Sequence, residues 1–297
     1  MVVTNAELKT KVIKKLENIL NEFGKEVFNK DNKVSIELES LDLQKKIIGN
    51  LYFPTFYKDG KIYINSNYLD IILNNHKSNP RLIHELMKSV IHEYVHVILD
   101  TDLKKKEVKE NLIIHESLAT LFENIYNTIS LDFPINKNKD IEESIEKINK
   151  YVINKLKDPN YLEKLENNMK KDIKEKLDTE MEELLKKYDK CINISYTSLD
   201  ILDLYYELKY YFLYRIPALL LQKNVKISEL IKDLSEKKSI DKYKEIIYKE
   251  FENLEKNNII KNLLDCTEYK LNKHLDYYSK FLESKILNLG LQEIAEE

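Results

Sequence analysis

Turn-forming residues are rare in this chain, which contains only 4 glycines and 5 prolines among 297 residues. Glycine and proline are the residues that most often interrupt helices and strands, so long uninterrupted segments are expected. Hydrophobic residues make up 43% of the chain and charged residues 33%, which is typical of a soluble globular protein with a buried core. The sequence therefore predicts a predominantly helical fold.

A small sheet is predicted near the N-terminus, after a first helix. Residues 5–28 place apolar side chains at helical spacing on one face, which indicates an amphipathic helix. Residues 33–40 alternate between apolar and polar side chains, as in a strand with one buried face. An Asp-Gly dipeptide then separates two aromatic and β-branched segments, and this pair favours a two-residue hairpin turn. We therefore expect hairpin strands near 52–58 and 61–65.

Helices are predicted for most of the remaining chain, because apolar residues recur there at spacings of three and four. The predicted helical segments are 67–75, 81–99, 107–129, 140–190 with a break at Asp158-Pro159, 198–222, 228–235, 240–256 and 265–288. The polar run 131–140 contains a proline and suggests a boundary between two parts of the chain. We therefore expect an α+β fold with a part that contains the sheet at 1–130 and an all-helical part at 131–297.

Several classes of partner and location are disfavoured by composition. The net charge of −3 offers no basic excess for neutralising nucleic-acid phosphates. The most apolar run, 201–222, is interrupted by charged residues, so no membrane span is expected. The two cysteines are far apart and form no CxxC pair, and the N-terminus lacks the pattern of a secretion signal, which favours the cytoplasm. The sequence leaves the oligomeric state open.

Residues 92–96 read His-Glu-Tyr-Val-His within an otherwise apolar helical segment. Residues four apart share one face of a helix, so His92 and His96 can direct their imidazoles to the same point. Glu93 lies about 100° further round the helix, where its carboxylate can reach a water held by a metal ion. Two imidazole ligands beside a carboxylate base form the arrangement of a catalytic zinc site.

A third metal ligand is expected from the following helix. Burying an unpaired His-Glu-His group in an apolar helix would cost several kcal/mol, and a bound metal offsets that cost. Residues 107–129 supply His115 and Glu116, and either could bind the metal. Both cannot do so from one face, because adjacent helical residues point about 100° apart.

The motif and its spacing resemble the gluzincin metallopeptidases, the zinc peptidases typified by thermolysin. Glu116 lies twenty residues beyond His96, as does the ligand glutamate in many gluzincins, and the order of helix, sheet and motif helix over about 1–130 is also similar. The resemblance implies that His92, His96 and Glu116 bind one Zn²⁺ ion. It further implies that Glu93 is the general base in the hydrolysis of a peptide or protein substrate.

The resemblance also implies a sheet edge that pairs with an extended substrate through main-chain hydrogen bonds. For this edge the sequence offers residues 61–65, with Tyr63 as the substrate-binding residue. One position departs from the thermolysin-like pattern, because Thr120 stands where an aspartate would hold the first histidine. Asp100 or Glu123 could replace that aspartate, although an ordinary surface charge is the simpler interpretation of each.

Gluzincins usually take a further side chain from their C-terminal part to stabilise the oxyanion. Tyr214 is our candidate for this catalytic role, and Tyr211 and His274 are alternatives. Arg215 is one of only two arginines and lies in an apolar, aromatic segment, which suggests a buried bidentate contact. Its partner could be a structural carboxylate or a substrate carbonyl.

Two other functions are compatible with the sequence. The first is a gluzincin-like binding module without activity, which the missing aspartate would explain. The second is a helical interaction protein with an accidental HExxH motif, which would bind no metal and tolerate His92→Ala. The sequence does not determine peptide specificity, the choice between endo- and exopeptidase activity, or the physiological substrate.

Overall fold

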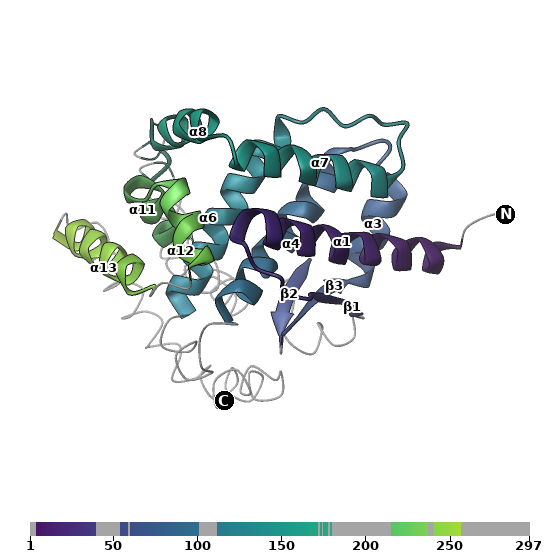
Figure 1. The fold of residues 1–297 in the computed structure, drawn as a ribbon, viewed down its shortest axis with the longest axis horizontal. Coiled ribbons are helices and arrows are strands. Elements are labelled where there is room, and N and C mark those ends of the chain that lie inside the picture. Colours follow the sequence, from purple (N-terminus) through teal and green to yellow (C-terminus); the bar gives the residue numbers. More distant parts are fainter. Residues whose placement is uncertain are drawn as a thin grey trace, which may run out of the picture.

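The protein folds into a predominantly helical α+β structure, shown as a computed structural model in Figure 1. A small mixed sheet lies beside a group of packed helices, which confirms the predicted fold class. The structure describes residues 4–39, 54–58, 60–100, 112–171, 173, 175–177, 179, 215–236 and 240–256. Within these residues, none of the helices has both the length and the apolar character required to cross a bilayer.

Most of the predicted elements are present where they can be examined. The strands are β1 (Ser35–Glu39), β2 (Thr55–Lys58) and β3 (Lys61–Asn65). The helices are α1 (Asn5–Phe28), α3 (Ser66–Asn75), α4 (Arg81–Asp100), α6 (Leu112–Leu131), α7 (Ile141–Leu156), α8 (Pro159–Lys171), α11 (Ile216–Asn224), α12 (Ile227–Ser235) and α13 (Asp241–Lys256). Predicted helical residues 198–214 and 265–288 lie outside the described residues.

Local signals define both ends of α1. The Thr4 side chain accepts a hydrogen bond from the Glu7 amide, and the Glu7 carboxylate accepts one from the Thr4 amide at 2.9 Å. This reciprocal capping box satisfies amide groups that have no partner within the helix. Asn29 ends the helix in the left-handed conformation, with φ of 52°. The apolar face of α1 can therefore pack along its whole length.

The sheet has the order β1-β3-β2, with β1 parallel and β2 antiparallel to β3. Gly60 has φ of +79°, as the hairpin between β2 and β3 requires. The prediction that residues 61–65 form an exposed edge is wrong, because β3 pairs with a strand on each side and both rows of its main-chain groups are used. Among the described residues, β1 and β2 form the edges.

One hydrophobic core joins elements from both predicted parts of the chain. In Figure 1, α7 runs alongside α1, and α4 and α6 lie next to each other. Buried side chains from all four helices belong to the same cluster, including Leu16, Leu86, Phe122 and Ile148. The core therefore continues across residues 131–140, and the division at 130 stays a prediction. Packing of α4 against α6 is what brings residues 92–96 next to Glu116.

Gly24 allows α1 to approach α4 closely at the centre of the HEYVH motif. A Cβ atom at this position would lie 1.7 Å from the Tyr94 hydroxyl oxygen and 3.2 Å from the Lys30 carbonyl oxygen. Tyr94 is completely buried, so its ring has little room to move aside. The absence of a side chain at Gly24 is therefore a packing requirement.

We expect Gly24→Ala to lower the free energy of unfolding by about 1–3 kcal/mol, because overpacking outweighs the gain in helix propensity. The measurement is chemical denaturation of the metal-free protein. Tyr94→Phe removes the atom nearest to the new methyl group, so Gly24→Ala should be less destabilising in that background. Equal stability of wild type and Gly24→Ala would contradict this packing.

Candidate metal centre

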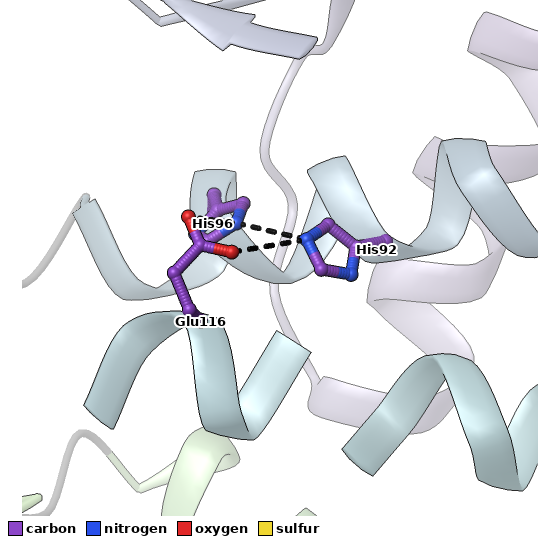
Figure 2. Close-up of side chains that lie close together, drawn as sticks. All are labelled: His92, His96 and Glu116. Carbon is purple, nitrogen blue, oxygen red and sulfur yellow. Dashed lines mark hydrogen bonds and ion pairs between the residues drawn. The ribbon is translucent and has the colours of Figure 1, made fainter. Parts of the chain in front are cut away.

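Three side chains from two helices converge on one point (Figure 2). His92 and His96 project from α4, and Glu116 projects from the facing α6. The two imidazole Nε2 atoms lie 3.3 Å apart. Glu116 places Oε2 at 3.4 Å from His92 Nε2 and Oε1 at 3.5 Å from His96 Nε2. Helical spacing within α4 and packing of α4 against α6 are sufficient to produce this cluster.

The spacing of the three side chains is compatible with a shared metal ion. Bonds of about 2.0–2.1 Å to a tetrahedral zinc ion place neighbouring ligand atoms about 3.3–3.4 Å apart. The separation of the two Nε2 atoms agrees with that value, and each Nε2 lies 3.4–3.5 Å from a different oxygen of Glu116. One ligand atom from each of the three residues lies within 4.8 Å of the other two. Among the described residues, His92, His96 and Glu116 form the one group of His, Cys, Asp or Glu side chains whose ligand atoms lie close enough together to hold a metal ion. Three such ligands leave one position for water or substrate, as in catalytic zinc sites.

Glu123 fixes the orientation of the first histidine. Its Oε2 lies 2.9 Å from His92 Nδ1, and because a carboxylate can only accept, Nδ1 is the donor. In the neutral ring, Nε2 then carries a lone pair directed at the cluster. Burial lowers the pKa of His92, but hydrogen bonds to Glu116 and Glu123 outweigh it and raise the pKa well above its ordinary value. Glu123 thus makes the contact that an aspartate at position 120 would have supplied.

The position of Glu123 explains how Thr120 is accommodated. Glu123 follows Glu116 by seven residues, or nearly two helical turns, so both side chains leave α6 on the same face. Thr120 itself is buried. Lys88 lies 3.8 Å from the second oxygen of Glu123 and balances part of its charge. Of the two substitutes considered from sequence, Glu123 takes this role, whereas the side chain of Asp100 lies outside the described residues.

We expect Glu123→Gln to weaken zinc binding by about 10–100-fold, the usual cost of removing a partner that orients a ligand histidine. Competition against a chromophoric chelator measures the affinity. Glu143→Gln on α7 is a matched control, because Glu143 pairs with Lys139 and Lys147 and contacts no histidine among the described residues. Equal affinities for wild type and Glu123→Gln would show that this contact does not orient His92.

Glu93 is a buried carboxylate beside the cluster. Its side chain is buried, and its Oε1 accepts a hydrogen bond from the Thr55 hydroxyl at 3.1 Å. Burial raises the pKa of Glu93 above its ordinary value, although the charges of His92 and His96 act in the opposite direction. A carboxylate whose pKa is raised toward neutrality is better suited to accept and return a proton.

The structure distinguishes between the two possible third ligands. Glu116 belongs to the convergent cluster and His115 does not. Burial would raise the pKa of Glu116, but the neighbouring His96 and His92 lower it well below its ordinary value, which favours the ionised ligand form. Burial lowers the pKa of His115 to about 4, with a further contribution from His96. His115 is therefore a neutral buried side chain at ordinary pH.

Strand β2 contributes two residues to the site that sequence analysis did not identify. Thr55 contacts Glu93, and the Tyr57 ring stacks on the His96 ring with centroids 6.2 Å apart. Both residues lie on the same face of the strand because they are two apart. The only sequence signal for them was this alternation, which does not reveal which helix the strand will face.

Tyr63 lies away from the metal centre. In the hairpin, Tyr63 pairs with Phe56, and their rings stack with centroids 4.9 Å apart. Ile62 and Ile64 point to the opposite, buried face, which is the face of Thr55 and Tyr57. Because β3 is the central strand, the main-chain pairing that suggested Tyr63 as a substrate-binding residue is not available there.

Arg215 is exposed at the start of α11, so the prediction of a buried arginine is wrong. Residues 216–222 are all buried, and the helix begins with Pro217 in its first turn. A long charged side chain at this boundary can extend into solvent while the following apolar residues enter the core. Tyr214 and its alternatives Tyr211 and His274 lie outside the described residues, so the oxyanion-stabilising residue stays a prediction.

No family model matches the sequence, and comparisons with curated proteins and with solved structures return no match.

Proposed function

We propose that this protein is a zinc-dependent metallopeptidase of gluzincin type. The observation that carries the proposal is the convergence of His92 Nε2, His96 Nε2 and the Glu116 carboxylate at separations of 3.3–3.5 Å. A buried carboxylate, Glu93, lies one residue from the first of these ligands. This donor set with an adjacent base is suited to the hydrolysis of an amide bond.

The chain's own residues would divide the chemistry between them. Zinc, when bound, would supply Lewis-acid polarisation of the scissile carbonyl and lower the pKa of water toward about 7. His92, His96 and Glu116 would hold the ion, and Glu123 would keep the His92 imidazole in the required tautomer. Glu93 would accept a proton from the attacking water on its carboxylate and pass it to the leaving amine.

The substrate is proposed to be an extended peptide or protein segment. Among the described residues, β2 forms the edge of the sheet beside α4, so it replaces β3 as the strand that could pair with substrate. Tyr57 on the same strand stacks on a metal ligand, which would bring a paired peptide close to the metal. Location in the cytoplasm stays a prediction.

Both alternative functions receive less support from the geometry. An inactive binding module was suggested by the missing aspartate, but Glu123 makes the corresponding contact to His92. An accidental motif gives no reason for two Nε2 atoms and a carboxylate from another helix to face one another at 3.3–3.5 Å. We therefore retain the peptidase as the proposed function.

Cleavage of an unbiased peptide mixture, read by mass spectrometry, tests the proposal. Metal-free protein should give no products, and protein reconstituted with one equivalent of zinc should give a consistent set of cut sites. His96→Ala prepared in parallel controls for a contaminating peptidase. Products that do not depend on zinc, or no products from the zinc-loaded protein, would contradict the proposed function.

A further inference from the structure

We propose that Thr55 is a positioning residue that orients the Glu93 carboxylate for proton transfer. This inference rests on the proposed function, because it assigns Glu93 the role of base. It adds a residue from the sheet to a site whose other members come from α4 and α6.

Thr55 is held rigidly between the sheet and α4. It lies opposite Ile64 in the antiparallel register, so its side chain is on the face of the sheet turned toward the core. Its exposed fraction is only 4%. Its Oγ1 atom lies 3.1 Å from Glu93 Oε1 and 3.4 Å from the Ser89 carbonyl oxygen. Buried main-chain and side-chain contacts therefore fix the position of this hydroxyl.

The hydroxyl has one proton and two neighbouring acceptors. A hydrogen bond to an ionised carboxylate is shorter and roughly twice as strong as one to a neutral carbonyl. The shorter distance is also the one to Glu93, so the proton is donated to Oε1 when Glu93 is ionised. Oε1 is thereby engaged, and Oε2 is the oxygen left to accept the proton of the reacting water.

This contact restricts rotation of the carboxylate about its last side-chain bond. A general base acts only when its free oxygen is within hydrogen-bond reach of the proton it removes. Without the hydroxyl, the buried carboxylate can rotate and loses its fixed donor. The effect should appear in the chemical step rather than in substrate binding or metal affinity.

Thr55→Val tests the inference, because valine keeps the branched shape and removes the hydroxyl. We expect kcat to fall about tenfold to hundredfold, which is the value of a hydrogen bond to a charged group, with little change in KM. Thr55→Ser keeps a hydroxyl and should recover most of the loss. Thr128→Val makes the same chemical change on α6, where the exposed Thr128 hydroxyl bonds only to the Asn124 carbonyl among the contacts described, and should leave kcat unchanged.

A second readout does not require turnover. A hydroxamic acid that chelates the metal releases a proton that the neighbouring carboxylate is placed to accept. Its affinity, measured by calorimetry, should therefore fall in Thr55→Val and recover in Thr55→Ser. Zinc stoichiometry and thermal stability of each variant should stay close to wild type, which separates positioning from a purely structural role.

The outcomes separate the two claims. The role of Thr55 would be overturned if Thr55→Val kept the wild-type kcat and hydroxamate affinity while Glu93→Gln was inactive. That result would leave the proposed function intact. Loss of zinc or of folded protein in Thr55→Val and Thr55→Ser alike would also overturn it, in favour of a structural role. A zinc-loaded wild type that neither cleaves peptides nor binds the hydroxamate would overturn the proposed function itself.

Discussion

Replacing Glu93 by glutamine is expected to reduce kcat/KM for peptide hydrolysis by about 10²–10⁴-fold, the usual contribution of a general base. Glutamine has nearly the same volume and can still accept the Thr55 hydrogen bond through its amide oxygen. It cannot take a proton from water, so the loss should lie in kcat rather than in KM. Initial rates on a peptide identified from the mixture would measure it, at matched zinc content.

Glu85→Gln provides a matched control on the same helix. Glu85 pairs with Lys88 at 2.6 Å, and its side chain is half exposed. Glu85→Gln removes one negative charge from α4, as Glu93→Gln does, but leaves the three proposed metal ligands unchanged. Activity close to wild type in both variants would show that Glu93 is not the base, and a loss in Glu85→Gln as large as in Glu93→Gln would point to a general charge effect.

His96→Ala is expected to weaken zinc binding by more than about 100-fold. Removing a partner that only orients a ligand already costs 10–100-fold, and this change removes the ligand itself. Only His92 and Glu116 would remain from the cluster, which is too few for a closed coordination shell. Equilibrium competition with a chelator of known affinity gives the dissociation constant, and hydrolysis should be lost in parallel.

His76→Ala is the corresponding control for loss of a buried histidine. His76 lies at the C-terminal end of α3, where its Nδ1 atom is 2.9 Å from the Leu73 carbonyl oxygen. We expect a modest loss of stability in this variant and unchanged zinc affinity. Zinc binding by His96→Ala at wild-type strength would place the metal elsewhere.

Local sequence signals predicted most of the elements around the candidate metal centre. The apolar periodicity of α1 and α4 and the hairpin dipeptide each act within a few residues, so they are readable from the sequence. The same holds for His92 and His96, whose shared face follows from helical geometry alone. The pairing of Glu116 with them required only that the next helix return along α4.

Contacts between distant segments were not predictable in this way. The parallel pairing of β1 with β3 joins strands separated in sequence, and it turned an expected edge strand into a central one. Thr55 reaches Glu93 across 38 positions, and no pattern in either segment indicates the contact. Glu123 was one of two possible partners for His92, and its contact with His92 depends on the packing of α4 against α6.

A crystal structure of the zinc-loaded protein, with anomalous scattering recorded at the zinc edge, tests the metal centre most directly. The account predicts one zinc peak per chain, with His92 Nε2, His96 Nε2 and the Glu116 carboxylate as ligands at about 2.0–2.2 Å and a solvent molecule completing the shell. A zinc ion bound by other residues, a fourth protein ligand closing the site, or no zinc between α4 and α6 would contradict it.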